Sequence, residues 1–308
     1  MSQTGAAVRH LTTKERHKLL HRYRVTDGQG FKLKHFDPTD TADHLVGKHE
    51  AEALLQGGVE HLSALQEKLF AQDRWAVLCI FQAMDAAGKD GTIKHVMSGV
   101  NPAGVQVTSF KAPGPEELKH DFLWRAARSL PERGRIGIFN RSHYEESLVV
   151  RVHPDFLEKQ HLPAALIGKK IWDKRLAAIA SFERYLADQG TLVLKFFLHI
   201  SKDEQKRRFM ERLDEPGKNW KFSPADLAER RHWDDYQDAY QAAIAATAAP
   251  HAPWYVVPAD NKWFTRLVVV RAICDALEGL DLTPPPLTRE LTAALDAARA
   301  ELMAETPV

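Results

Sequence analysis

Short apolar runs alternate with longer stretches of mixed polar and apolar residues along most of the chain. Five runs lack the strict alternation of a half-buried strand; they lie at residues 75–81, 105–110, 136–139, 191–200 and 254–257. Continuous runs rich in Val, Ile, Leu and Phe suit strands that are buried on both faces. Because these strands alternate with helical stretches, the pattern predicts an α/β fold with a parallel sheet and helices on both faces.

The polar stretches divide the chain into three parts. Residues 1–40 are turn-rich and predict a basic N-terminal arm, since residues 1–35 hold eight Lys/Arg and two acids. Residues 41–280 form the expected domain, with a helix from about His44 to Gln72 and a helical lid at about 202–233. After Pro284-Pro-Pro286 we expect an acidic helical tail over residues 281–308. The opposite charges of the two ends could attract each other or, more simply, belong to two solvated tails.

The composition excludes several classes of protein. Of 308 residues, 27% are charged and 44% hydrophobic, which is typical of a globular chain, and the net charge is +1. Two cysteines exclude a disulfide framework. Because no apolar run is long enough to span a bilayer and no signal peptide is evident, we expect a cytoplasmic protein without membrane or nucleic-acid partners. The fifteen histidines show no clear metal-ligand spacing.

The segment at residues 75–92 predicts a phosphate-binding loop. A buried strand ends near Gln82, small residues follow, and a helix is expected from about Lys89 to Gly99. Small residues let backbone N–H groups close around an anion, and the helix N-terminus adds partial positive charge. Lys89 is placed to reach the outer phosphates. The candidate phosphate-binding residues of the loop are Ala86, Ala87, Gly88, Lys89 and Gly91.

This loop departs from the usual phosphate-loop pattern at two positions. Ala83 stands in place of the first glycine, and Asp90 stands in place of the usual Ser or Thr. A carboxylate is a hard oxygen ligand for Mg²⁺, and Asp85 adds a second one within the loop. We therefore expect Mg²⁺ to be held by Asp85 and Asp90. The alternative is a tight structural turn whose Lys and Asp side chains are merely solvated.

A second polar segment follows the third apolar run, at Asn140-Arg-Ser-His-Tyr-Glu-Glu146. Open α/β sheets place their chemistry at such strand ends. Arg141 and, ten residues later, Arg151 are candidates for binding phosphate, and Glu145 or Glu146 could position a metal, a water or an acceptor. Asn140 stands where an acid is usual. The alternative is a helix start capped by Asn140 or Ser142, with the glutamates in its first turn.

The polar region near residue 202 carries a cluster of cations. Ser201 and Glu204 have the spacing of a capping box, and Arg208 and Arg212 stand one turn apart, where they could clamp a polyphosphate. Lys218 and Lys221 follow in a loop around Trp220, which completes a mobile cationic lid. The alternative is a surface helix held by ion pairs such as Glu204 with Arg208.

Five blocks of sequence together resemble the polyphosphate kinase 2 family, whose members move phosphoryl groups between inorganic polyphosphate and nucleotides. They span most of the chain and keep the family's order. The blocks are Met84-Asp-Ala-Ala-Gly-Lys-Asp-Gly91, Asn101-Pro-Ala-Gly-Val105 with Ser109-Phe-Lys111, Phe139-Asn-Arg-Ser-His-Tyr-Glu145, Asp214-Glu-Pro-Gly-Lys-Asn-Trp-Lys-Phe-Ser-Pro224 and Trp254-Tyr-Val-Val-Pro-Ala-Asp-Asn-Lys-Trp263.

The resemblance implies a P-loop kinase fold with a helical lid, Mg²⁺ dependence and a homo-oligomer. It implies reversible transfer between polyphosphate and adenine nucleotides, with guanine nucleotides as further candidates. Asn140 with Glu145 resembles the subgroup that phosphorylates both AMP and ADP. By match of motif and by position, the expected catalytic residues are Asp85, Lys89, Arg141, Glu145 and Arg208, and the further phosphate-binding residues are Arg151, Arg212 and Lys221.

Two other functions remain open on the sequence. The first is an ATP-dependent nucleoside monophosphate kinase on the same fold, which salt would inhibit less than an enzyme with a polyanionic donor. The second is a non-catalytic module that senses nucleotide or polyphosphate. Ala83 and Asn140 are the residues that favour such a degenerate loop.

Overall fold

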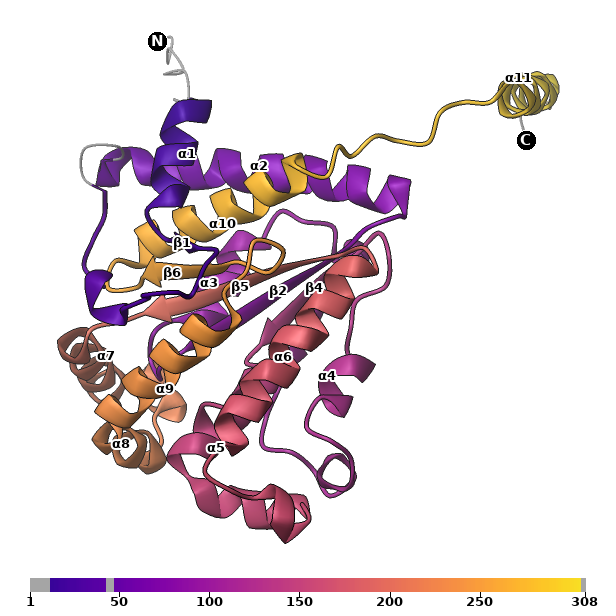
Figure 1. Cartoon of the computed structure of the whole chain (residues 1–308). Coiled ribbons are helices and arrows are strands. Elements are labelled where there is room, and N and C mark those ends of the chain that lie inside the picture. Colours follow the sequence, from indigo (N-terminus) through magenta and orange to yellow (C-terminus); the bar gives the residue numbers. More distant parts are fainter. Residues whose placement is uncertain (1–11, 43–46, 306–308) are drawn as a thin grey trace.

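A six-stranded sheet with the strand order β1-β6-β5-β2-β4-β3 forms the centre of the computed structural model, which describes residues 12–42 and 47–305 (Figure 1). Five strands are parallel, and β1 pairs antiparallel with β6 at one edge. The predicted α/β fold with a parallel sheet is therefore confirmed. The strands are β1 (Arg24–Val25), β2 (Ala76–Ala83), β3 (Val105–Ser109), β4 (Ile136–Asn140), β5 (Thr191–His199) and β6 (Trp254–Pro258).

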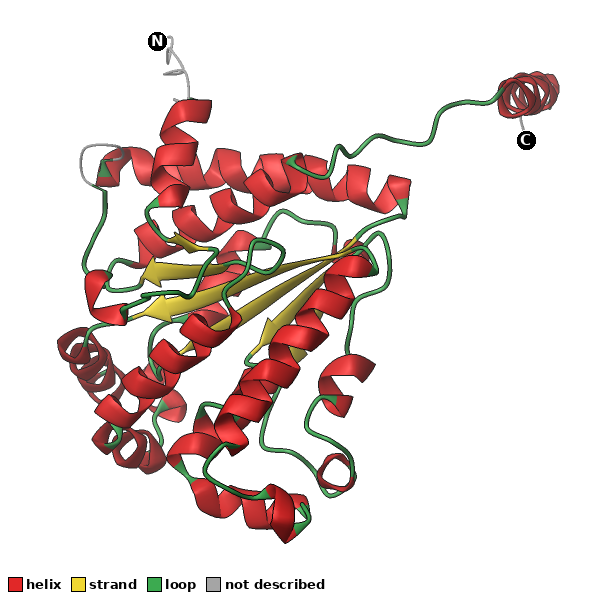
Figure 2. Ribbon diagram, viewed as in Figure 1, coloured by secondary structure: helices red, strands yellow, loops and turns green. Residues whose placement is uncertain are grey.

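Helices cover both faces of the sheet, as Figure 2 shows. On one face α2 (Lys48–Gln72), α3 (Lys89–Val96) and α10 (Lys262–Glu278) pack together, with α1 (Thr13–His21) against α10. On the other face α6 (Ile171–Asp188) packs against α9 (Trp233–Thr247). The remaining α-helices are α4 (Trp124–Arg128), α5 (Val149–Val152), α7 (Lys202–Asp214), α8 (Pro224–Arg231) and α11 (Arg289–Ala304).

Aromatic side chains join the central strands. Phe81 on β2 lies opposite Phe196 on β5, which in turn lies opposite Tyr255 on β6. Their rings stack with centroids 4.9 and 5.3 Å apart, and all three side chains are buried. Each such pair contributes about 0.5–1.5 kcal/mol beyond the burial of its area. The ladder fixes the register of the strands whose ends carry the site.

The predicted N-terminal arm is wrong for residues 12–40. Leu19, Leu20 and Tyr23 are buried in the main hydrophobic core, and β1 extends the sheet. A Cβ atom on Gly28 would lie 1.7 Å from the Ala245 carbonyl oxygen, so the backbone of this segment rests directly on α9. The segment exposes basic side chains to solvent, while its apolar side chains form part of the hydrophobic core. Residues 1–11 of the predicted arm lie outside the described residues.

The helix expected after the three prolines is α11. It follows an extended segment and projects away from the body of the molecule (Figure 1). The helix expected from about His44 begins at Lys48 among the described residues and ends at Gln72, as predicted. The helix expected up to Gly99 ends earlier, at Val96. Among residues 12–42 and 47–305, no helix combines the length and apolarity that crossing a membrane requires.

Candidate active site

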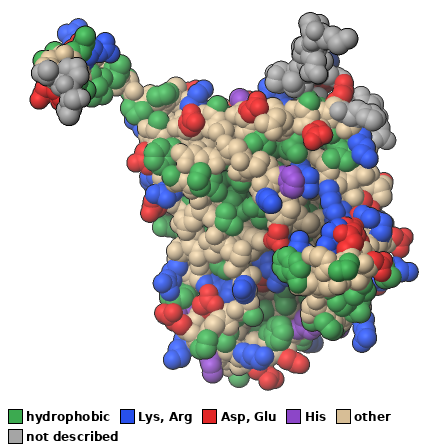
Figure 3. Space-filling model, turned by 180° about the vertical axis from the view of Figure 1, so that it is seen from behind, with side chains coloured by type: hydrophobic (Ala, Val, Ile, Leu, Met, Phe, Trp, Pro, Cys, Tyr) green, Lys and Arg blue, Asp and Glu red, His purple; other side chains and the backbone are tan. Residues whose placement is uncertain are grey.

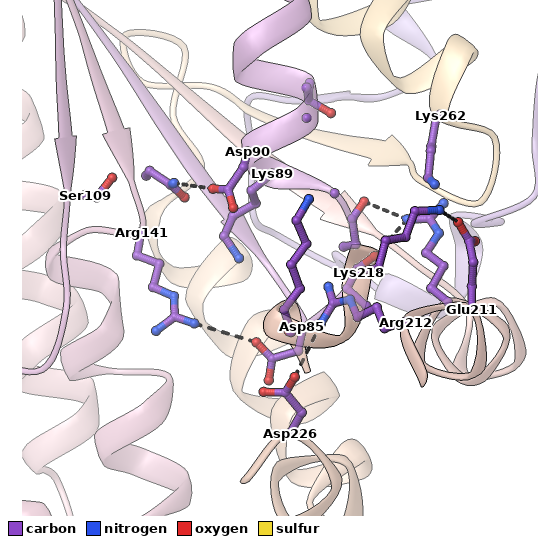
Figure 4. Close-up of a pocket in the computed structure, with 18 of the residues that line it drawn as sticks. Asp85, Lys89, Asp90, Ser109, Arg141, Glu211, Arg212, Lys218, Asp226 and Lys262 are labelled. Atoms are coloured by element: carbon purple, nitrogen blue, oxygen red, sulfur yellow. Dashed lines mark hydrogen bonds and ion pairs between the residues drawn. The ribbon is translucent and has the colours of Figure 1, made fainter. Parts of the chain in front are cut away.

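A cavity of about 700 Å³ lies at the carboxyl ends of β2, β3 and β4. One side is formed by the loop from Asp85 to Asp90 and by the ends of β3 and β4, and the other by α7, α8 and the start of α10. Figure 4 shows Arg141 and Lys262 on opposite sides of this space, with Lys89 between them. In Figure 3, Lys and Arg side chains gather where the lobe of α7 and α8 meets the body. The cavity is lined by charged groups of both signs.

The loop between β2 and α3 has the backbone of an anion-binding turn. Ala86 and Gly88 adopt left-handed conformations, with φ of 60° and 99°. For an alanine this costs about 1 kcal/mol or more, which a ligand-binding loop commonly tolerates. The Asp85 carbonyl accepts a hydrogen bond of 3.0 Å from the Gln205 side chain on α7. Because N–H and C=O of a trans peptide point in opposite directions, the N–H of Ala86 points away from α7.

Arg208 donates hydrogen bonds to the carbonyls of this loop, and its direct role on phosphate stays a prediction. Its side chain is 4% exposed, and all five of its N–H groups have acceptors. Nη1 donates to the Ala86 and Ala87 carbonyls at 2.9 Å, Nε donates to Glu204 at 2.7 Å, and Nη2 donates to the Ala259 and Asp260 carbonyls. Arg208 lines the cavity, but its donors hold the loop in shape. In this structure it positions the loop.

The capping box expected at the start of α7 is formed only in part. Ser201 Oγ accepts from the Glu204 amide, but the Ser201 amide donates to Asp260 instead of Glu204. Glu204 turns instead to Arg207 and Arg208. Through Gln205 and Arg208, α7 therefore holds the carbonyls of the phosphate loop. The helix α7, which begins the predicted lid, and the phosphate loop are joined by hydrogen bonds.

Lys89 and Arg141 bring two cations to the cavity beside acids. Lys89 Nζ donates to the Ala83 carbonyl at 3.3 Å, and Arg141 Nη2 lies 3.6 Å from an Asp85 oxygen. Burial lowers the pKa of Lys89 and Arg141 lowers it further, while Asp85, Glu145 and Asp90 oppose this. A phosphate beside Lys89 would stabilise its charged form. Burial raises the pKa of Glu145, which Arg141 and Lys89 partly offset.

The two aspartates of the loop suit a magnesium ion. Asp85 and Asp90 both line the cavity, and Asp90 Oδ1 accepts a 2.6 Å hydrogen bond from Asn140. Mg²⁺ typically binds one or two carboxylates together with waters and substrate phosphates. The described residues contain no group of three or more His, Cys, Asp and Glu side chains able to hold a metal. The donor set therefore fits a hard ion shared with phosphates rather than a fully protein-bound zinc ion.

A buried polar cluster anchors the turn that follows β4. Ser142 caps the turn by accepting from the Tyr144 amide, and the Tyr144 hydroxyl lies 2.8 Å from Glu183. Lys195 donates to Glu183 at 2.5 Å, and this pair is almost fully inaccessible to solvent. Asn140 instead pairs with Asp90. The turn therefore combines the capping that was one alternative with the placing of Arg141 in the cavity. Glu145 does not line the cavity, but its charge interacts with Lys89 and Arg141.

The remaining predicted cations fall into two groups. Arg212 lines the cavity and pairs with Asp226 at 3.3 Å, and Lys221 lines it with its amine over the Trp220 ring. Arg151 lines a separate hollow together with Lys32 and is not among the residues that line this cavity, and its role in binding phosphate stays a prediction. It lies on the four-residue α5, which follows a 3-10 turn after β4.

Besides Lys218, which was expected only as part of the lid, three lining cations were not predicted as site residues. Lys111 follows β3, and Lys262 and Arg266 lie one turn apart at the start of α10, which follows β6. The carboxyl ends of parallel strands meet at one edge of a sheet. Reading the residues that follow every predicted strand, including the last, would have identified these positions from the sequence.

The sheet, the loop with its lysine and the lid define a P-loop phosphotransferase of the kinase type. A family model described as Polyphosphate kinase 2 matches residues 46–283, and the chain belongs to that family. It is 53% identical over 267 residues to an ADP-polyphosphate phosphotransferase of Rhodopseudomonas palustris, covering 86% of this chain and 92% of the relative.

Two further relatives agree with this assignment. The chain is 49% identical over 264 residues to an AMP/ADP-polyphosphate phosphotransferase of Meiothermus ruber, covering 86% of this chain and 95% of the relative. The crystal structure of polyphosphate kinase 2 from Arthrobacter aurescens TC1 superposes with a TM-score of 0.84 at 42% identity. It covers 97% of this chain and all of that one. The similarity thus extends over nearly the whole chain.

Proposed function

We propose that this protein transfers the terminal phosphoryl group of inorganic polyphosphate to AMP and to ADP, and that the reaction is reversible. The observation that carries the proposal is the convergence of Lys89, Asp85 and Asp90 in one cavity of a chain that belongs to this family. The Meiothermus ruber relative, which is named for both acceptors, supports the choice of AMP and ADP. Of the three functions open on the sequence, the family supports this one.

The geometry suits phosphoryl transfer, in which catalysis is mainly positioning and stabilisation of charge. Lys89 and the amides of the loop would hold phosphates of the donor. Arg141, which is partly exposed beside Asp85, would stabilise charge on the transferred group. Asp85 and Asp90 would hold Mg²⁺, which when bound would neutralise phosphate charge. Arg208 and Gln205 would keep the loop in its binding shape.

The acceptor nucleotide would bind on the side of β3 and β4. Ser109, Phe110 and Lys111 end β3 there, beside Asn140 and Arg141. The attacking atom is a phosphate oxygen, which is largely anionic near neutral pH because its second pKa is about 6. No strong general base is needed. Glu145, beside Lys89 and Arg141, would act on the acceptor through a water or the metal.

Phosphorus NMR tests this function directly. The purified protein is incubated with Mg²⁺, polyphosphate and AMP, then with ADP, without ATP. Growth of nucleotide β- and γ-phosphate signals as polyphosphate is consumed is the expected result. ADP formed from AMP only once ATP is supplied would instead identify a nucleoside monophosphate kinase. Saturable binding of polyphosphate without any transfer would identify a sensing module.

Glu145→Asn is expected to lower kcat/KM for AMP about tenfold more than for ADP. AMP has one phosphate fewer than ADP with which to contact Lys89 and Arg141. The position of AMP therefore depends more on the water or metal ion through which Glu145 would act. The measurement is the kcat/KM ratio of the two acceptors at fixed polyphosphate. Glu158→Asn, an exposed glutamate outside the cavity, is the matched control and should leave the ratio unchanged. An equal loss on both acceptors would contradict the assignment to the subgroup that uses both.

We also propose that the protein is a homo-oligomer. Exposed leucines lie along α11 at 291, 295 and 302, with Ala298 completing the four-three-four spacing of a helical seam. An isolated helix of 16 residues is marginally stable in water, so a partner for this face would stabilise it. Light scattering over a range of concentrations is expected to give a mass of at least two chains, and the mass of one chain would contradict the proposal.

A further inference from the structure

Among the lining cations that have no part in the mechanism above, two lie together on α10. Lys262 is the first residue of α10, and Arg266 lies one turn further along the same helix. Both line the cavity on the side away from β3 and β4. Figure 4 shows Lys262 extending from α10 toward the part of the cavity near Glu211 and Lys218.

These two side chains differ from Lys218 and Arg212 in their pairing. Lys218 forms ion pairs with Glu211 and Glu215, and Arg212 pairs with Asp226. Among residues 12–42 and 47–305, no carboxylate lies within 4.0 Å of the charged nitrogens of Lys262 or Arg266. Glu211 is the nearby acid, and it is committed to Lys218 and Arg207.

Arg207 and Arg208 place further positive charge near Lys262. Burial lowers the pKa of Lys262 and Arg208 lowers it further, while burial also lowers the pKa of Arg266. Charges in a partly desolvated cavity gain most from a counter-charge placed beside them. Two adjacent cations at helical spacing offer that gain to an anion with more than one charge.

We propose that Lys262 and Arg266 form a distal subsite for the donor, which binds polyphosphate units beyond those held by Lys89 and the loop. This proposal rests on the proposed function, since it extends the path of that donor. The chain would run from the loop toward α10, away from the acceptor side at β3 and β4. A donor of a few phosphates would end at the loop, whereas a long chain would reach the subsite.

The subsite predicts a dependence on donor length. A contact to a charged group is strongest where it is well formed, and it is weaker where water screens it. For two partly exposed cations we expect a combined effect of about tenfold in affinity for a long chain. Binding of the long chain should also depend more steeply on salt than binding of a short one.

The test compares the double variant Lys262→Ala, Arg266→Ala with the wild-type protein on two donors, tripolyphosphate and long-chain polyphosphate. The measured quantity is the KM for the long chain divided by the KM for tripolyphosphate. We expect the double variant to raise this ratio about tenfold. The matched control is Lys170→Ala, Lys174→Ala, two exposed lysines with the same spacing at the start of α6, and it should leave the ratio unchanged.

Equilibrium binding of long-chain polyphosphate separates failure of this inference from failure of the proposed function. Calorimetric titration of both proteins, with thermal unfolding to establish that the double variant folds, needs no turnover. Weaker binding by the double variant alone supports the subsite even if no phosphoryl transfer is found. Equal binding by both proteins, or an equal change of both KM values, overturns it.

Discussion

Lys89→Ala is expected to lower turnover of polyphosphate by on the order of 10³-fold while the protein keeps its fold. The Lys89 amine has one weak contact to the protein, to the Ala83 carbonyl at 3.3 Å, so little structure depends on it. Removing one preorganised donor that faces developing charge typically costs about 10²–10³-fold in kcat. Here the lysine also interacts with three carboxylates, those of Asp85, Asp90 and Glu145, whose negative charge it partly offsets.

The measurement is kcat with AMP and polyphosphate at saturating Mg²⁺, together with the melting temperature. Lys94→Ala is the matched control, because Lys94 lies on the same helix, is exposed and does not line the cavity. It should keep full activity. If Lys89→Ala keeps most of its activity, the loop is not the phosphate site.

Arg208→Met is expected to lower the free energy of unfolding by about 3–5 kcal/mol and to lower activity with it. The substitution removes all five hydrogen bonds of a 4% exposed guanidinium, leaves four carbonyl oxygens without this donor and leaves Glu204 with Arg207 as its remaining arginine partner. A buried polar group left without its partner typically costs about 1–3 kcal/mol, so several such losses together account for the expected effect. The loop would lose its brace from α7.

Urea unfolding of the full chain measures this effect. Arg207→Met is the matched control, since Arg207 is the next residue, contacts the same glutamate and is 60% exposed. Its loss should stay within about 0.5 kcal/mol. An Arg208→Met protein with wild-type stability but no turnover would support the direct phosphate role that the sequence suggested.

Most of the sheet could be predicted from the sequence because its central strands are continuous apolar runs, and the run at residues 136–139 corresponds closely to β4. The run at residues 105–110 corresponds to β3, but this strand lies at an edge of the sheet and is partly exposed, so the predicted burial on both faces is wrong for it. The two-residue β1 could not be found in this way, since Arg24 and Val25 form no run. Its strand character comes from pairing with β6 and from the burial of Tyr23 beside it. The many Lys and Arg residues of the N-terminal segment predicted a solvated arm, whereas its few apolar residues pack into the core.

In the candidate site, too, the local features could be predicted from the sequence and those that depend on tertiary packing could not. The loop from Asp85 to Asp90 is local, so neighbours in sequence are neighbours in space and the pattern alone located it. The roles of Arg208 and Arg151 depend on where a helix faces and where it breaks, which tertiary packing decides. Helical spacing placed Arg208 beside Arg212, but only the fold shows that one is engaged by carbonyls and the other by Asp226.

The strand order affects how the preference for donor length and the choice of acceptor can be changed. β2, which leads into the phosphate loop, lies between β4 and β3 on one side and β5 and β6 on the other. The segments proposed to meet the acceptor follow β3 and β4, and those proposed to meet the distal donor follow β6. Substitutions on the two flanks are therefore separated by the phosphate loop that both substrates would share. An engineer can alter donor length and acceptor choice in separate libraries and then combine them with little interference.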